Sequence, residues 1–276
     1  MRKPRIGILV VAYNAENHLR QTLHRIPAEL RPKIEEVFVF DDASKDRTHE
    51  VGKALQEEWE GTHLTIYKNP VNLMYGGNQR QGYKYAIEKG FDIVVLLHGD
   101  GQYAPEVMQE LLTPLETGQA DMVMGSRMMV PGAALRGNMP PYKYYGNKIL
   151  TWMENSLLGT NLTEFHSGYR AYSVHALRNI PLDSLTSNWH FDTQIVLEFL
   201  KQGYRIREVP IPTYYGDEIC HVNGIPYAMN CVRSALGYCL FHRWRSHASL
   251  PAAPRPQEQP PADIAPAEAT PAKTHP

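Results

Sequence analysis

The stretch Ile93-Val-Val-Leu-Leu97, followed at once by His98-Gly-Asp-Gly-Gln102, decides the fold of this 276-residue chain. A short, unbroken aliphatic run indicates a strand that is buried on both faces, as in a parallel sheet covered by helices. The polar residues that follow put a carboxylate, Asp100, at the carboxyl end of that strand. Ligands of open α/β sheets lie at this edge. The stretch therefore predicts both the kind of sheet and the place of a site.

The same alternation of strands and helices extends to both sides of this stretch. Predicted strands cover residues 5–12, 37–40, 64–67, 93–97, 121–125 and 205–210. Predicted helices cover residues 16–25, 48–58, 77–89, 105–116, 144–158, 187–202 and 225–244. This order is typical of an α/β fold with a mostly parallel central sheet and helices on both faces.

The composition excludes several classes of protein. Hydrophobic residues make up 43% of the chain, which is enough for a sizeable core, and the formal net charge is −1. The near-zero charge argues against a broad basic surface, so we expect no nucleic-acid partner. Cys220, Cys231 and Cys239 show no CxxC spacing, which argues against a disulfide framework or a structural zinc site.

The longest aliphatic run falls far short of the ~20 residues that a membrane span requires. We therefore expect a cytoplasmic protein that is either free or peripheral at the cytoplasmic face of a membrane. Residues 1–246 are predicted to form one domain. Residues 247–276 are predicted to form a disordered Pro/Ala-rich tail, because eight prolines lie between positions 251 and 276 and bar regular structure.

Acidic and basic groups follow several predicted strands. Asp41 and Asp42 end one strand, Asp100 and Gln102 follow another, and Arg127 follows a third. Two acidic strand ends beside an arginine describe a site for an anionic ligand together with a cation. Oxygen ligands such as those of Asp100 and Gln102 suit Mg²⁺ or Mn²⁺.

Two of these segments leave alternatives open. The aspartates at 41, 42 and 46 either cap the helix that begins at residue 48 or accept hydrogen bonds from a base or ribose. The glycine-bearing segment at residues 72–82 is neither GxGxxG nor GxxxxGK[ST]. It is either a tight loop before a helix or a backbone contact beside the ligand.

Six motifs, taken together and in order, resemble the family 2 glycosyltransferases with the GT-A fold. They are AYNAE at 12–16, FDDASKD at 40–46, NLMYGGNQRQG at 72–82, LLHGDGQYAPE at 96–106, MGSR at 124–127 and HSGYRAYS at 166–173. The chain is most similar to the branch of dolichyl-phosphate mannosyltransferase-like enzymes. The resemblance covers about residues 5–230 and implies a role in cell-envelope glycan biosynthesis.

The resemblance implies a role for each matching residue. The nucleotide-sugar-binding residues would be Ala12, Tyr13, Glu16, Asp41, Asp42 and Gly77. The catalytic residues would be Asp100, Arg127 and Glu164. The metal ligands would be His98, Asp100 and Gln102. The acceptor-side residues would be His166, Ser167, Gly168 and Arg170.

Two positions depart from the family pattern. His98 stands where many relatives have the first aspartate of the metal-binding DxD motif. A neutral imidazole can bind Mn²⁺ but is a poor ligand for Mg²⁺, so the choice between these two cations stays open. Glu164 stands near the place of an aspartate that usually precedes the SG pair, and His166 beside it is either an acceptor-side group or a structural hydrogen-bond partner.

The implied activity is metal-assisted transfer of a sugar from a nucleotide-diphosphate donor to an acceptor. A polyprenyl or dolichyl phosphate, a growing glycan and a small molecule are the alternative acceptors. A phosphate acceptor is already an anion and needs no general base, so basic residues would matter more. The candidate basic residues are Arg127, Arg136, Lys143 and Arg170.

Other readings of the chain were weighed against this one. A transferase-fold scaffold without activity is favoured only by His98. A sugar-nucleotide pyrophosphorylase would carry a GxGxR-like segment after the first strand, which residues 11–14 lack. The helix predicted at residues 225–244 either docks on the core or rests on a membrane surface. A lipid acceptor would require such peripheral membrane contact or a membrane partner protein. The polar segment at residues 214–224 is interpreted as a substrate loop, with a second metal site as the alternative.

Overall fold

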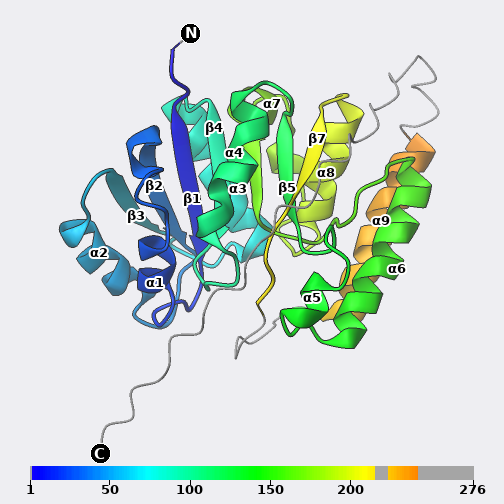
Figure 1. Ribbon diagram of the computed structural model, residues 1–276, viewed down its shortest axis with the longest axis horizontal. Helices are drawn as coiled ribbons and strands as arrows, with labels where there is room; N and C mark the ends of the chain where they lie inside the picture. The colour runs from blue at the N-terminus through cyan, green and yellow to red at the C-terminus, as the bar shows by residue number, and fades with distance from the viewer. Residues whose placement is uncertain (1, 215–222, 242–276) are drawn as a thin grey trace, which may run out of the picture.

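The computed structural model describes residues 2–214 and 223–241 (Figure 1). The predicted tail, the end of the helix predicted at residues 225–244, and most of the polar segment at residues 214–224 lie outside these described residues. The boundary at residue 246 between domain and tail stays a prediction for the same reason.

A seven-stranded sheet in the order β3-β2-β1-β4-β6-β5-β7 forms the centre of the molecule. Its strands are β1 (Ile6–Ala12), β2 (Ile34–Asp41), β3 (His63–Lys68), β4 (Ile93–His98), β5 (Met122–Ser126), β6 (Arg170–Ser173) and β7 (Ile206–Pro210). Neighbouring pairs are parallel except that β6 runs antiparallel to both β4 and β5. The predicted α/β class with a mostly parallel sheet is confirmed.

Helices cover both faces of this sheet (Figure 1). The helices are α1 (Leu19–His24), α2 (Thr48–Glu58), α3 (Met74–Lys89), α4 (Met108–Glu116), α5 (Ala133–Arg136), α6 (Pro141–Leu158), α7 (Val174–Leu177), α8 (Phe191–Lys201) and α9 (Gly224–Phe241). Short 3₁₀ turns occupy Arg31–Lys33, Pro105–Val107 and Leu182–Ser184.

Two separate cores result, one on each face of the sheet. Leu23 of α1, Leu55 of α2 and Leu111 of α4 belong to one core. Tyr83 of α3 and Phe199 of α8 belong to the other. Successive strand residues point to opposite faces, so a continuous apolar strand such as β4 supplies side chains to both cores. Helices α6 and α9 pack against each other beyond the β7 side of the sheet, where α9 also contacts α8.

The antiparallel strand β6 is the main feature that the sequence did not predict. It has only four residues, and its first is an arginine, so it gives no apolar run. Because β6 enters the sheet from the carboxyl edge of its neighbours, the residues that precede it lie at that edge. This reversal brings the HSGYR motif to the strand ends that carry Asp41, Asp100 and Arg127.

Two helices begin earlier than predicted. α6 begins at Pro141, where proline is well suited because the first helical turn needs no N–H partner. α3 begins at Met74 and includes Gly76 and Gly77. A side chain at Gly76 would clash with Phe191, so the missing side chain lets α3 approach the segment before α8. Within the described residues, no helix combines the length and apolarity that a membrane span requires.

Candidate active site

The register of the sheet brings the predicted strand-end residues together. Ala12 of β1 pairs with Asp41 of β2, and Asp41 pairs with Lys68 of β3. On the other side of β1, Val11 pairs with His98 of β4. The polar residues that follow these strands therefore share one edge of the sheet, which is the lower edge in Figure 1.

Asp41 is fully buried, and one of its carboxylate oxygens accepts no hydrogen bond from the described residues. Its Oδ1 accepts hydrogen bonds from the backbone N–H of Ser44 at 3.0 Å and from the hydroxyl of the same residue. Its Oδ2 has no hydrogen-bond partner among the described residues and lies 4.0 Å from Nζ of Lys68. A buried oxygen without a donor is costly. Oδ2 is therefore ready to accept an N–H or O–H group from a ligand.

The neighbouring Asp42 is held firmly by its surroundings. Its Oδ1 accepts hydrogen bonds from Nδ2 of Asn69 at 2.9 Å and from the backbone N–H of Leu73 at 2.8 Å. Burial raises the pKa of Asp42 above its ordinary value, although these hydrogen bonds oppose the shift. Asn69, which the sequence analysis did not single out, thus positions this carboxylate.

The loops after β1 and β2 are tied to each other by backbone-to-side-chain hydrogen bonds. The N–H of Asn14 donates to Oγ of Ser44 at 2.9 Å, and Oδ1 of Asn14 accepts from the N–H of Lys45 at 3.0 Å. Glu16 accepts from the N–H of Arg47 at 2.9 Å. Asn14 has a φ of 50°, a left-handed conformation that asparagine tolerates better than most residues.

These bonds leave the ring of Tyr13 at the surface of the loop, where it is 44% exposed. An exposed aromatic ring at the strand edge that also carries the unpartnered oxygen of Asp41 suits a nucleobase, since an aromatic ring can stack on a base and a carboxylate oxygen can accept its N–H. The predicted capping role is also present, because Oδ1 of Asp46 accepts from the N–H of Thr48 at the start of α2.

Asp100 lies in a tight turn directly after β4. Its Oδ1 accepts the N–H of Gln102 at 3.1 Å, and both side chains are partly exposed. Carboxylate and amide oxygens of this kind are the ligands that Mg²⁺ and Mn²⁺ prefer, so the residues present fit a divalent cation.

His98 is partly buried and lies against two aromatic side chains. Its Nε2 lies 3.4 Å from the hydroxyl of Tyr75, and its ring makes an edge contact with Tyr103. A side chain at Gly168 would lie only 2.7 Å from this ring, so glycine is required there. Burial lowers the pKa of His98, although the charge of Asp100 opposes the shift. A metal bound through Nε2 of this neutral ring would compete with the contact to Tyr75.

A buried network continues from Tyr75 into the core. The hydroxyl of Tyr75 donates to Oδ2 of Asp192 at 2.6 Å, and Oδ1 of Asp192 lies 3.8 Å from the guanidinium of Arg170. The ring of Trp189 stacks on the ring of Tyr75, with their centroids 4.6 Å apart. Neither Tyr75 nor Asp192 was predicted as a site residue. The only signal for Asp192 is its place as an acidic residue in the first turn of α8, a position that many helices occupy with an acid.

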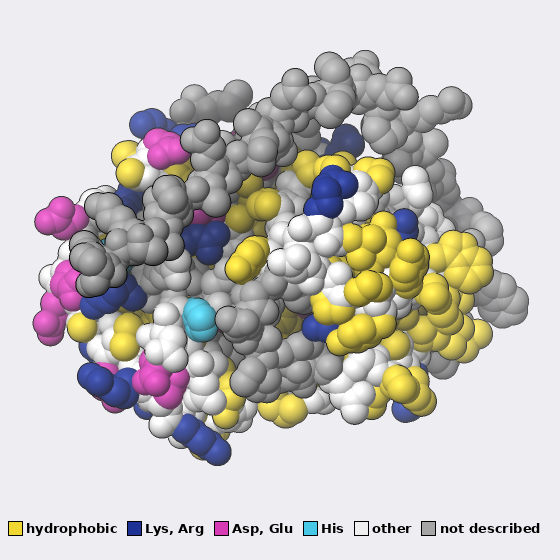
Figure 2. All heavy atoms as spheres, turned by 60° about the horizontal axis from the view of Figure 1, so that its bottom comes forward, with side chains coloured by type: hydrophobic (Ala, Val, Ile, Leu, Met, Phe, Trp, Pro, Cys, Tyr) yellow, Lys and Arg dark blue, Asp and Glu magenta, His cyan; other side chains and the backbone are white. Residues whose placement is uncertain are grey.

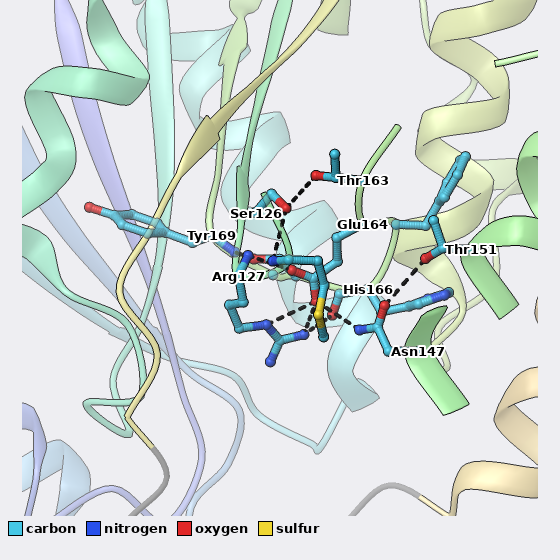
Figure 3. Close-up of polar contacts among 12 residues, drawn as sticks. Ser126, Arg127, Asn147, Thr151, Thr163, Glu164, His166 and Tyr169 are labelled. Atoms are coloured by element: carbon cyan, nitrogen blue, oxygen red, sulfur yellow. Dashed lines mark hydrogen bonds and ion pairs between the residues drawn. The ribbon is translucent and has the colours of Figure 1, made fainter. Parts of the chain in front are cut away.

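Arg127 and Glu164 form a buried ion pair at the site (Figure 3). The backbone N–H of Arg127 donates to Oε2 at 2.7 Å, and Nε and Nη2 donate to Oε1. Nδ2 of Asn147 in α6 donates a further hydrogen bond to Oε1 at 2.8 Å, which is the fourth that the Glu164 carboxylate accepts. Burial raises the pKa of Glu164, but Arg127 outweighs burial and the net shift is downward.

Glu208 of β7 holds the backbone on which Glu164 lies. Its two oxygens accept the N–H groups of Thr163 and Glu164 at 2.7 and 3.0 Å. Asn147 and Glu208 were not predicted, because one lies within a helix and the other within a strand, and nothing in their spacing marks them. Both serve to place the carboxylate that holds Arg127.

The four predicted acceptor-side residues have different surroundings. Arg170 is fully buried, and its guanidinium donates to the carbonyl oxygens of Phe165, Ser167 and Asp192 at 2.7–2.8 Å. Arg170 thus supports the segment before β6, and a direct contact with the acceptor stays a prediction. The N–H of Gly168 donates to the Tyr103 hydroxyl at 2.7 Å.

The other predicted positions are also occupied by protein contacts. Ser167 is fully buried, and its Oγ accepts from the N–H of Tyr169 at 3.3 Å. His166 points away from Arg127, because its Nδ1 lies 2.9 Å from the hydroxyl of Tyr227 in α9. Gly77 lies inside α3, where a side chain would meet Leu73, so its absent side chain serves helix packing.

Similarity to known proteins agrees with this fold and this site. The family model described as Glycosyl transferase family 2 matches residues 7–180. Undecaprenyl-phosphate mannosyltransferase of Micrococcus luteus is 34% identical over 214 residues, which are 75% of this chain and 82% of that relative. UDP-N-acetylglucosamine–dolichyl-phosphate N-acetylglucosaminyltransferase of Methanococcus voltae is 29% identical over 220 residues, 76% of this chain and 86% of that relative.

A solved structure supports the fold. Glucosyl-3-phosphoglycerate synthase from Mycobacterium tuberculosis, crystallised with Mn²⁺, UDP-glucose and phosphoglyceric acid, superposes with a TM-score of 0.62 at 17% identity. The superposition covers 86% of this chain and 80% of that one. The predicted GT-A fold is confirmed. The chain belongs to glycosyl transferase family 2 and is a glycosyltransferase, as the six motifs predicted.

Proposed function

We propose that this enzyme transfers a hexose from a nucleoside-diphosphate sugar to a polyprenyl phosphate. Two relatives support the acceptor class, since they act on undecaprenyl phosphate and dolichyl phosphate. The geometry supports the same class, because the acidic residue beside Arg127 is not available as a base.

The nucleoside of the donor would lie over the ends of β1 and β2. Tyr13 would stack on the base, and Oδ2 of Asp41 would accept its N–H group. Asp42 would accept from the ribose hydroxyls. Both carboxylates are already fixed by protein donors, so little side-chain entropy is lost when the donor binds.

Asp100 and Gln102 would hold a divalent cation, and the supported choices are Mg²⁺ and Mn²⁺. Such a cation supplies positive charge to a diphosphate leaving group. Glucosyl-3-phosphoglycerate synthase, which shares the fold, was crystallised with Mn²⁺ and UDP-glucose. His98 would contribute by packing, since its Nε2 faces the hydroxyl of Tyr75.

The observation that carries the proposal is the set of hydrogen bonds that the Glu164 carboxylate accepts. Both of its oxygens accept hydrogen bonds from Arg127, and Asn147 takes a further position on Oε1. A carboxylate used in this way, with its pKa lowered, is a poor acceptor for the proton of an alcohol. An acceptor that is already an anion needs no such base, and the Arg127 guanidinium is well suited to bind a phosphate. Glu164 would therefore orient Arg127.

The acceptor's lipid portion would be reached at the membrane surface through α6 and α9. Figure 2 shows hydrophobic side chains gathered on the right of the molecule, where these two helices lie in Figure 1. Exposed apolar residues on this face are Tyr142, Tyr145, Ile149, Trp152, Ile225, Met229, Leu236 and Leu240. A groove between the helices is lined by Leu150, Met153 and Val232 among others. Contiguous exposed apolar surface of this kind marks a contact surface.

A transfer assay with matched acceptors tests the proposal. The enzyme is incubated with Mn²⁺ or Mg²⁺, with UDP-, GDP-, CDP- and dTDP-hexoses in turn, and with either a polyprenyl phosphate or the corresponding polyprenol. We expect transfer to the phosphate only, with one donor class preferred. Transfer to the polyprenol at a similar rate would contradict the assigned acceptor, and transfer to neither would contradict the proposed function.

A further inference from the structure

A second cluster of potential ligand atoms lies outside the proposed donor site. It consists of Glu154 in α6, His166 in the segment before β6, and Cys231 in α9. One carboxylate oxygen, one ring nitrogen and the sulfur all lie within 4.8 Å of one another. Glu154 and Cys231 are fully buried, so the cluster is closed to solvent.

Glu154 and His166 form a buried ion pair inside this cluster. Neither Oε1 nor Oε2 of Glu154 has a further hydrogen-bond partner among the described residues, and neither does Nε2 of His166. Nε2 and Oε2 lie 3.1 Å apart, within ion-pair distance. A fully buried carboxylate normally accepts several hydrogen bonds, and each missing one is costly. Oε1 of Glu154 has no partner among the described residues, and Oε2 has only the ring of His166.

Two further hydrogen bonds fix the ring of His166 and the sulfur of Cys231. Nδ1 of His166 is engaged with the hydroxyl of Tyr227 at 2.9 Å, which fixes the ring and leaves Nε2 directed at Glu154. The hydroxyl of Thr193 in α8 donates to Sγ of Cys231 at 3.2 Å. An outer hydrogen bond to the second ring nitrogen is the usual companion of a metal-bound histidine.

We propose that Glu154, His166 and Cys231 form a structural binding site for Zn²⁺ or a similar borderline transition metal. Sulfur, imidazole and carboxylate together suit Zn²⁺ and do not suit Mg²⁺. In tetrahedral zinc sites the ligand atoms lie about 3.3–3.6 Å apart, so the widest pair here closes by up to about 1.5 Å on binding. The negative charges of the carboxylate and the thiolate neutralise the bound divalent cation, which lowers the free-energy cost of burying its charge.

The proposed site would join three parts of the molecule that bear on the reaction. It connects α6 and α9, whose outer face is apolar, to the segment at residues 163–168. The carbonyl oxygen of His166 in that segment accepts from Nη2 of Arg127 at 3.3 Å. The metal would act as a cross-link that holds the apolar face in register with the arginine.

Metal content of the purified full-length chain tests this proposal without any assay of activity. Protein is expressed with added zinc, purified without chelator, and analysed by mass spectrometry of the elements. We expect about one zinc per wild-type chain and per Cys239→Ser chain, and a strong loss in Cys231→Ser and Glu154→Gln. Cys239 is the matched control, because its Sγ contacts the carbonyl of Leu157 and is not part of the cluster.

A cobalt spectrum keeps the proposal falsifiable if a variant folds poorly. Wild-type protein stripped of metal and titrated with Co²⁺ should show a thiolate-to-cobalt charge-transfer band that added Zn²⁺ abolishes. Asp100→Ala should keep that band, which separates this site from the proposed donor site. Wild-type protein that carries no metal and gives no such band would overturn the proposal and leave a buried Glu154–His166 ion pair. Equal metal content in Cys231→Ser and Cys239→Ser would overturn it too.

Discussion

Glu164 accepts hydrogen bonds from both the backbone and the side chain of Arg127, and through them it fixes where the guanidinium lies. The pair is buried, with the Arg127 side chain 12% exposed and that of Glu164 fully covered. Charge-assisted bonds of this kind are stronger than neutral ones and restrict geometry. The pair joins β5 to the segment that precedes β6.

The roles of the two partners can be separated by substitution. Arg127→Ala should lower kcat/KM by about 10²–10³, as expected when a charged donor to the reacting groups is removed. Glu164→Gln keeps the size and one acceptor, and we expect a smaller loss of about tenfold. A pH–rate profile is the decisive readout. Wild type and Glu164→Gln should show the same profile, and loss of a limb in the variant would identify Glu164 as a base.

Replacement of Asp100 tests the proposed place of the cation. Asp100→Ala should reduce turnover by at least about a hundredfold and remove the stimulation by Mn²⁺. The control is Asp183→Ala, because Asp183 is exposed and pairs only with Lys84 at the surface. Turnover of both variants is measured across a range of Mn²⁺ concentrations. Near-normal, Mn²⁺-stimulated turnover of Asp100→Ala would remove this residue from the site.

The raised pKa of Asp42 predicts a trade-off between stability and donor binding. Burial raises the pKa in the folded chain above the unfolded value of about 3.9, so this group favours folding most at low pH. That contribution to the free energy of unfolding is lost as the pH rises through the folded pKa. The carboxylate therefore costs stability once it is ionised.

Asp42→Asn removes that cost while retaining an oxygen that can accept from Asn69 and Leu73. We expect a higher Tm at pH 7, by about 2–4 °C for each kcal/mol regained, and a difference that disappears near pH 4. Donor affinity should fall in the same variant. Thermal unfolding between pH 4 and 8 and donor titration measure the two effects. A Tm difference that does not depend on pH would show that the charge of Asp42 is not its cause.

The apolar face of α6 and α9 predicts binding to a lipid surface. Ile149 and Met229 are 60% and 67% exposed on this face. The double variant Ile149→Glu, Met229→Glu should lose co-flotation with vesicles that contain anionic lipid, while Gln119→Glu, an exposed residue outside this face, should not. Activity toward a water-soluble, short-chain polyprenyl phosphate should be unchanged in both. Unchanged flotation of the double variant would exclude this face as the contact.

Much of the sheet could be predicted because its strands are continuous apolar runs. α2 and the strands β1, β3, β4 and β5 have the ranges expected to within one residue at each end. The polar residues after them were identified for the same reason, since burial on both faces makes a carboxylate at a strand end conspicuous. The antiparallel β6 was missed because tertiary pairing, rather than its own pattern, makes it a strand.

The surroundings of the site residues could not be predicted, because long-range contacts determine them. Arg170 matched a motif, yet only the fold shows that its guanidinium is used by three carbonyl oxygens. The cysteine spacing argued against a structural metal site. The fold brings Cys231 beside Glu154 and His166, although His166 is 65 positions away in the chain and Glu154 is farther still. No local spacing rule detects such a combination.

The most direct test of the central claim is to identify both products made by the wild-type enzyme. The enzyme is given its preferred donor and a polyprenyl phosphate, and the lipid product and the released nucleotide are analysed together by mass spectrometry. We predict a polyprenyl phosphate that carries one hexose, with one nucleoside diphosphate released for each lipid modified. Release of a nucleoside monophosphate with a sugar diphosphate lipid, or nucleotide release without any modified lipid, would contradict the account.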